Sequence, residues 1–389
     1  MKYHRRHLCL CLNWIRVITM ALGIYIHIHF CVSKCNYCDF NSFVAPKTLK
    51  EEYIDALCVE IGNFAGCNDI VDSIYFGGGT PTILEAEQLQ RVLYTVREKF
   101  DVADDCEITT ECNPATIDYK GFSALKKAGF NRISIGMQSA HNSQLKALGR
   151  IHSFEDCRAC VDSAREAGFD NISLDLMFGL PDQDMDSWLF SLNSAIALKP
   201  KHLSCYSLKI EEGTSFSKMK LNIPDDDEIS NMYAKCVEIL KENGYDRYEV
   251  SNFAKSGFES RHNCKYWLCQ DFAGFGAGAY SCVDGYRYSN IRNTTEYIDK
   301  INSLGSAQEE LTPLTKEDKM SEFVFLGLRM DKGISISAFK DRFNRDIFDV
   351  YGKEIEKNLS RGTLLLAGDI IKIPSQYTFV GNSILVDFI

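Results

Sequence analysis

Short apolar runs alternate along the chain with longer stretches whose apolar residues recur every three or four positions. The first run is GIYIHIH at residues 23–29, and in the following segment, 46–64, apolar residues recur at every fourth position from Leu49 to Ile61. The first pattern is typical of a buried strand and the second of an amphipathic helix. The start of the chain therefore predicts a strand followed by a helix.

This strand-then-helix unit repeats six times within residues 22–245. The predicted strands are 23–29, 73–76, 106–111, 131–137, 171–178 and 202–208. Such alternation predicts a parallel sheet with crossover helices, and six units suit a partial (β/α)6 barrel, a TIM-like α/β fold. Active sites of such barrels lie where strands end and loops begin.

The rest of the chain has a different pattern. Residues 246–309 are rich in Tyr, Asn and Gly and predict loops and short strands across the barrel mouth. Residues 310–389 predict helices followed by a hairpin, a small winged-helix-like α+β module. The module holds 11 Lys and Arg against 12 Asp and Glu, so it lacks the basic surface of a DNA-binding module.

Charge and cysteine content narrow the function further. The 389 residues are 45% hydrophobic and carry a formal net charge of -10, which is typical of a globular protein and argues against nucleic acid as a partner. The 16 cysteines are scattered rather than regularly paired. They indicate reduced thiols and a reducing compartment, so we expect a cytoplasmic protein.

The first 21 residues leave two interpretations open. Residues 1–38 contain no acidic residue, and the segment MKYHRRHLCLCLNWIRVITM is basic at its start and apolar afterwards. It is either an extension with a possible organelle-targeting role or the result of a mis-assigned start before Met20. Asn13 and Arg16 interrupt the apolar run, so a membrane span is not expected.

Three cysteines, Cys31, Cys35 and Cys38, follow the first predicted strand within eight residues. Clustered thiolates favour zinc or an iron-sulfur cluster. A structural zinc site is usually closed by four protein ligands. His27 and His29 could complete such a site only with difficulty, because they lie on the strand that leads into the cysteine loop. Three thiolates on a four-iron cluster would leave one iron open to a small molecule.

Polar and glycine residues stand at the ends of other predicted strands. GGGTPT follows the second strand, and a glycine run lets backbone N–H groups approach an anionic ligand closely. Glu111 and Asp175 interrupt otherwise apolar strands, where an unpaired carboxylate is costly, so each is expected to have a partner.

These motifs resemble the radical S-adenosylmethionine superfamily. Within it, YIHIHFCVSKCNYCDFN, FGGGTPT, GMQS and LDLMFGLP are similar to the oxygen-independent coproporphyrinogen oxidase group, from residue 23 to the end. The resemblance implies that Cys31, Cys35 and Cys38 hold a 4Fe-4S cluster whose open iron binds S-adenosylmethionine. It further implies cofactor contacts by Tyr25, Tyr37, Gly78, Gly79, Thr80, Glu111, Gln138, Arg150 and Asp175.

Two departures distinguish this chain from the oxidases. The oxidase group resembles the pattern C-x3-C-x2-C-x-C, and this chain has Phe40 at the position of the last cysteine. The sequence CDFN, in contrast, is similar to the sister branch of HemW-type heme chaperones. RHNCKYW, residues 261–267, is similar to the HNxxYW motif of that branch, which implies heme contacts by His262, Tyr266 and Trp267.

The resemblance therefore implies a heme chaperone that hands heme to acceptor hemoproteins and uses an electron donor for its cluster. The alternative is a coproporphyrinogen III oxidase of porphyrin biosynthesis. The sequence does not decide whether the protein oxidises coproporphyrinogen III, because Phe40 replaces the additional cysteine of the oxidases.

Overall fold

The computed structural model of the protein describes residues 21–66 and 69–389. Six parallel strands form the centre of a twelve-stranded sheet in the order β12-β11-β10-β9-β1-β2-β3-β4-β5-β6-β8-β7. The central strands are β1 (Leu22–Ile28), β2 (Val71–Gly78), β3 (Val102–Cys112), β4 (Arg132–Gln138), β5 (Asn171–Phe178) and β6 (His202–Ser207). Each lies within a few residues of the strand that its apolar run predicts.

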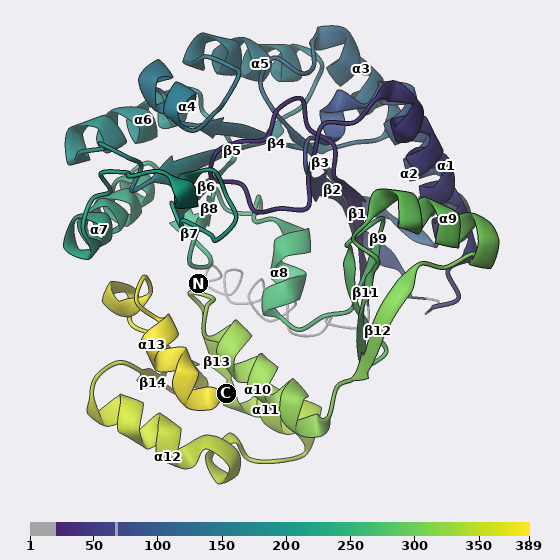
Figure 1. Cartoon of the computed structure of the whole chain (residues 1–389). Coiled ribbons are helices and arrows are strands. Elements are labelled where there is room, and N and C mark those ends of the chain that lie inside the picture. The colour runs from purple at the N-terminus through teal and green to yellow at the C-terminus, as the bar shows by residue number, and fades with distance from the viewer. Residues whose placement is uncertain (1–20, 67–68) are drawn as a thin grey trace, which may run out of the picture.

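The sheet curves into an open arc, and helices cover the outer face of its six central strands (Figure 1). They are α1 (Lys47–Asn63), α2 (Ala86–Lys99), α3 (Tyr119–Ala128), α4 (Asn142–Ala147), α5 (Phe154–Glu166), α6 (Met185–Ala197) and α7 (Asp226–Glu242), with 3-10 turns η1 (Pro81–Ile83) and η2 (Phe216–Lys218). The arc does not close, which confirms the predicted partial barrel.

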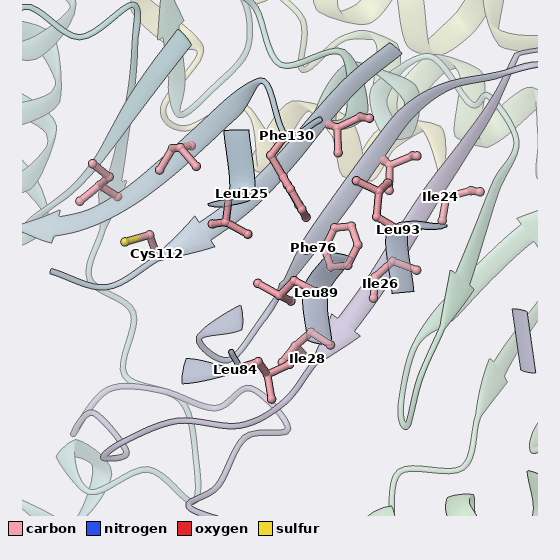
Figure 2. Close-up of a cluster of buried hydrophobic side chains, with 14 of the residues drawn as sticks. Ile24, Ile26, Ile28, Phe76, Leu84, Leu89, Leu93, Cys112, Leu125 and Phe130 are labelled. Carbon is pink, nitrogen blue, oxygen red and sulfur yellow. The ribbon is translucent and has the colours of Figure 1, made fainter. Parts of the chain in front are cut away.

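The core between strands and helices forms because one side of each strand is apolar. Figure 2 shows Ile24, Ile26 and Ile28 of β1 beside Phe76 of β2 and the α2 residue Leu89. The three isoleucines and Phe76 are completely buried. Burying such side chains stabilises the fold by roughly 1.5–3 kcal/mol each, and it fixes the register that places the strand ends at one rim.

Segment 246–309 extends the sheet at both edges, which the sequence pattern did not predict. Its elements are β7 (Asp246–Arg247), β8 (Asn252–Ala254), α8 (Arg261–Trp267), β9 (Phe272–Phe275), β10 (Tyr280–Val283), β11 (Tyr286–Asn290) and α9 (Thr294–Leu304). Strand β12 (Gln308–Pro313) crosses the predicted boundary at residue 309 and belongs to the same sheet. β9 pairs with β1 in parallel, and β8 pairs with β6 in antiparallel fashion. Helix α8, predicted as a loop, lies on the concave side of the arc (Figure 1).

The C-terminal module lies across the open side of the arc (Figure 1). In chain order it contains α10 (Lys316–Gly327), β13 (Ile334–Ser335), α11 (Ile336–Phe343), α12 (Ile347–Ser360), β14 (Leu365–Ala367), β15 (Ile370–Lys372), η3 (Ser375–Tyr377), α13 (Asn382–Leu385) and η4 (Val386–Phe388). Its three strands form a separate sheet in the order β13-β15-β14, and its buried residues form their own cluster. This succession of helices and hairpin agrees with the predicted winged-helix-like module.

The predicted N-terminal extension falls almost entirely on residues 1–20, which lie outside the described residues. Among the residues that the structure does describe, no helix is both long and apolar enough to cross a membrane.

Candidate functional site

The cysteines of CVSKCNYC lie on the loop between β1 and α1, directly after the carboxyl end of β1. Cys31 is buried, and its backbone N–H donates to the Phe43 carbonyl oxygen (3.0 Å), so the far end of the loop returns to the strand. Cys35 and Cys38 are half-buried, and the Cys38 N–H donates to the Cys35 carbonyl oxygen (3.2 Å). The loop therefore holds all three thiols at the end of one strand.

Each thiol has a polar neighbour. The contacts are Thr80 Oγ1 donating to Cys31 Sγ (3.6 Å), Arg150 Nη1 donating to Cys35 Sγ (3.4 Å), and Ser42 Oγ beside Cys38 Sγ (3.9 Å). Hydrogen bonds to sulfur influence the potential of an iron-sulfur cluster. Burial raises the pKa of the Cys38 thiol, and iron ligation would displace that proton. The donor set therefore fits iron-sulfur ligation.

The described part of the chain contains no set of side chains that could form a closed zinc site. Within residues 21–66 and 69–389, no three His, Cys, Asp or Glu side chains converge as ligands of one metal ion. His27 Nδ1 is hydrogen-bonded to the Tyr25 hydroxyl (3.0 Å), and His29 Nε2 to the Thr294 hydroxyl (2.9 Å). In a 4Fe-4S cluster each cysteine binds a different iron, so such convergence is not required.

The glycine run after β2 packs closely against the end of β1. Gly78 has a φ of +107°, and a Cβ there would lie 2.6 Å from the His27 ring. A Cβ on Gly79 would lie 2.7 Å from the Phe30 carbonyl oxygen. Only glycine fits such positions. Packing alone therefore accounts for these two glycines, and any ligand contact would be an additional role.

Four polar side chains project to the concave face of the sheet from neighbouring strands. Tyr25, Tyr75, Glu111 and Asp175 remain partly accessible, whereas the residues flanking them in their strands are mostly buried. Tyr25 and Tyr75 are partners in the β1–β2 register, and their ring centroids are 6.3 Å apart. The sheet thus gathers three of the predicted cofactor residues on one face.

Glu111 has the partner that its position in an apolar strand demands. The Tyr75 hydroxyl donates to one carboxylate oxygen (2.9 Å), and the Gly78 N–H donates to the other (3.2 Å). Burial raises the pKa of Glu111 to about 7, and the nearby Asp175 adds to this rise. Glu111 therefore changes its charge near neutral pH.

Asp175 and Gln138 lie on the adjacent strands β5 and β4. The Ser134 hydroxyl is 3.1 Å from both carboxylate oxygens of Asp175, and burial raises the pKa of this carboxyl. Gln138 ends β4 with a φ of +63° and a side chain that is 9% exposed. A left-handed glutamine is uncommon and marks a constrained strand end.

Arg150 binds more partners than an arginine at a helix end usually does. Its Nη2 atom donates to the Gly136 carbonyl oxygen and to Asn113 Oδ1, both at 2.6 Å, besides the contact with Cys35. Asn113 Nδ2 also donates to Thr80 Oγ1 (2.7 Å). Sequence reasoning missed Asn113, although its place directly after the third strand was a usable signal.

The Tyr37 side chain lies close to Arg150 and Cys35. It packs against a small apolar group that includes Leu148, Met177 and Leu180, and burial raises its pKa. The Asn36 N–H donates to the Leu148 carbonyl oxygen (3.0 Å). The cysteine loop is thus anchored on the segment that follows α4.

The HNCKYW stretch forms helix α8, and His262 is inside the protein. His262 is 1% exposed, its Nδ1 is hydrogen-bonded to the Ser73 hydroxyl (3.0 Å), and its Nε2 to the Tyr266 hydroxyl (2.9 Å). Its ring stacks on Tyr75, with centroids 5.4 Å apart. Burial lowers its pKa to about 3, so the imidazole is neutral. Ligation of iron by His262 would require breaking one of these hydrogen bonds.

Tyr266 contacts His262 directly, whereas Trp267 reaches the C-terminal module. The Tyr266 ring contacts Phe272 edge-on with centroids 4.6 Å apart, whereas Trp267 lies 5.9 Å from the Arg329 guanidinium of the C-terminal module. The helix therefore connects the concave face of the sheet to the module.

Comparison with known proteins agrees with this geometry. Residues 25–194 match the radical SAM superfamily, and residues 314–376 match the HemN C-terminal domain. The heme chaperone HemW of Bacillus subtilis (strain 168) is 35% identical over 372 residues, covering 94% of this chain and 98% of that protein. The chain belongs to the HemW family. HemW of Escherichia coli (strain K12) is 34% identical, covering 95% of this chain and 98% of that protein.

The fold of this HemW-family chain has a solved counterpart. Coproporphyrinogen III oxidase (HemN) from Escherichia coli, a radical SAM enzyme, superposes with a TM-score of 0.85 at 24% identity, covering 95% of this chain and 90% of that one. This similarity concerns the fold, which the two proteins share across barrel and C-terminal module.

Proposed function

We propose that this protein is a heme chaperone, which binds heme and passes it to acceptor hemoproteins. The observation that carries the proposal is the 35% identity to a protein named heme chaperone HemW over nearly the full length of both chains. The chain's own sequence supports it, because HNCKYW is present and the segment after the third cysteine reads CDFN.

The proposal includes a 4Fe-4S cluster held by Cys31, Cys35 and Cys38. S-adenosylmethionine would bind beside it, and the cluster would supply one electron to its sulfonium centre. The residues proposed to contact the cofactor are Tyr25, Tyr37, Gly78, Gly79, Thr80, Glu111, Gln138, Arg150 and Asp175. Thr80 and Arg150 support this assignment, since each donates a hydrogen bond to a cysteine sulfur.

Coproporphyrinogen oxidation is the second candidate, and the fold shared with HemN favours it. Phe40 argues against it. This residue stands where the oxidases have a further cysteine, and its side chain is 64% exposed on the cysteine loop. It is free of the barrel interior and supplies no ligand.

The deciding experiment is anaerobic. The cluster is reconstituted, and the protein is tested for binding of hemin, for transfer of heme to an apo-hemoprotein, and for turnover of coproporphyrinogen III with reductant and S-adenosylmethionine. We expect stoichiometric hemin binding and transfer, without decarboxylation. Robust decarboxylation of the porphyrinogen would refute the chaperone proposal.

Glu111 predicts a pH dependence of cofactor binding. Its raised pKa, about 7, means that the carboxyl holds its proton below that pH. The ammonium group of S-adenosylmethionine requires a carboxylate partner, so affinity should fall by about tenfold per pH unit below the pKa. Equilibrium binding between about pH 6 and about pH 8 measures this slope. Glu111→Gln should bind more weakly and lose the slope; a flat wild-type profile would contradict the role.

Compartment and partners complete the proposal. Every cysteine within residues 21–66 and 69–389 is a free thiol. This supports a reducing compartment such as the cytoplasm. An electron donor for the cluster and acceptor hemoproteins are the expected protein partners. The balanced charge of residues 310–389 supports a module that does not bind nucleic acid.

A further inference from the structure

A groove separates the edge of the main sheet from the C-terminal module. It lies between the end of α8, strands β9 to β11, and helices α10 and α11 (Figure 1). Its volume is about 650 Å³, within the range of roughly 300–1,000 Å³ that is typical of cofactor and ligand sites. The groove is therefore large enough for a flat organic cofactor.

Two thiols line this groove. Cys269 follows α8 in a left-handed turn with a φ of +50°, and Cys282 lies on β10 as the register partner of Phe272. Both cysteines are free and half-buried. The Arg287 guanidinium is within hydrogen-bonding reach of the Cys282 sulfur. A cysteine thiolate is one of the axial ligands that heme iron accepts in proteins.

The groove has both apolar walls and positive charge. Tyr266, Phe272 and Phe343 supply aromatic surface, and the basic lining residues are Arg287, Lys316, Lys319 and Arg342. Arg287 pairs with Glu322 (2.9 Å), and Arg342 donates to the Cys269 carbonyl oxygen (2.8 Å). Within residues 21–66 and 69–389, neither Lys316 nor Lys319 makes an ion pair. Two lysines thus remain available to carboxylates.

We infer that this groove is the heme site. The macrocycle lies against Tyr266 and Phe272, its propionates meet Lys316 and Lys319, and its ferric iron takes a thiolate ligand from Cys282 or Cys269. Ligation forms one Fe–S bond and releases the thiol proton to solvent, with no change of oxidation state. The inference rests on the proposed chaperone function and adds its binding site.

The site also gives the HNCKYW helix a different role. Tyr266 lines the groove, and its hydroxyl is hydrogen-bonded to the buried His262. His262 would then act as a positioning residue that orients a groove wall rather than as the iron ligand. Its replacement should weaken heme binding without changing the axial ligand.

The test uses the full-length, cluster-reconstituted protein with hemin and with iron-free protoporphyrin IX. EPR of the ferric heme identifies the axial ligand, and fluorescence quenching measures affinity. The double variant Cys269→Ser/Cys282→Ser should lose the thiolate signature and bind hemin at least about tenfold more weakly, with protoporphyrin affinity unchanged. Lys316→Glu/Lys319→Glu should weaken both ligands. Cys58→Ser, a half-buried free thiol on α1, is the matched control.

The outcomes separate the site from the function. Wild type that fails to bind hemin refutes both the chaperone proposal and the groove. Wild-type binding that survives unchanged in both double variants refutes the groove alone. Loss of the axial signature in His262→Ala, with retention in the cysteine double variant, would assign the ligand to His262 and overturn this inference.

Discussion

Cys35→Ser is expected to leave the protein folded but without its iron-sulfur cluster. Cys31 and Cys38 would be the only remaining ligands of the proposed set, and a hydroxyl is a poor substitute for the soft thiolate that iron-sulfur clusters require. Iron and sulfide content after anaerobic reconstitution, together with visible absorbance, measures the loss. Cys35 is half-buried at a loop, so the far-UV circular dichroism should stay unchanged.

Cys58→Ser serves again as the control, because this half-buried thiol lies on α1, away from the cysteine loop. It should retain full iron and sulfide. Wild-type cluster content in Cys35→Ser would show that this thiol is not a ligand, and the assignment of the CVSKCNYC loop would have to be abandoned.

Arg150→Ala is expected to weaken S-adenosylmethionine binding by about 10–100-fold, the usual cost of losing a group that supports a metal ligand. It should also destabilise the fold by about 2–3 kcal/mol, because Asn113 Oδ1 and the Gly136 carbonyl oxygen lose their donor. Both acceptors lie 2.6 Å from Arg150 Nη2. Urea unfolding of the cluster-free protein measures the stability change, and equilibrium binding to the reconstituted protein measures the affinity.

Arg158→Ala is the matched control, since Arg158 is an exposed arginine on α5. It should change neither quantity measurably. If Arg150→Ala bound the cofactor within about twofold of wild type while losing stability, Arg150 would be a purely structural residue.

Periodicity in the sequence was enough to predict the six central strands and the class of fold. Alternation within a strand is local, so Glu111 and Asp175 could be assigned to apolar strands, and their need for partners followed from the cost of burying a carboxylate. The cysteine spacing likewise lies within eight residues. Such features depend on residues that are close together in the chain, so they can be predicted from the sequence alone.

Contacts between distant segments were beyond this reasoning. The main partners of Arg150 are 115, 37 and 14 residues away along the chain, and its sequence neighbourhood resembles that of an ordinary solvated arginine. HNCKYW has a pattern too short to distinguish a loop from a helix. Its histidine is buried against strand β2, where Ser73, 189 residues away, is hydrogen-bonded to it and Tyr75 stacks on its ring.

The sequence by itself determined the barrel, the cysteine loop and the carboxylates on the concave strands, because each depends on local spacing and on the burial of apolar side chains. The tertiary structure decided which groups meet. It gave Arg150 its acceptors, enclosed His262, and brought Cys269, Cys282, Lys316 and Lys319 to one groove. The groove depends on packing the C-terminal module against the sheet. The contacts of Arg150 and His262 depend on segments that are far apart along the chain, which no local pattern encodes.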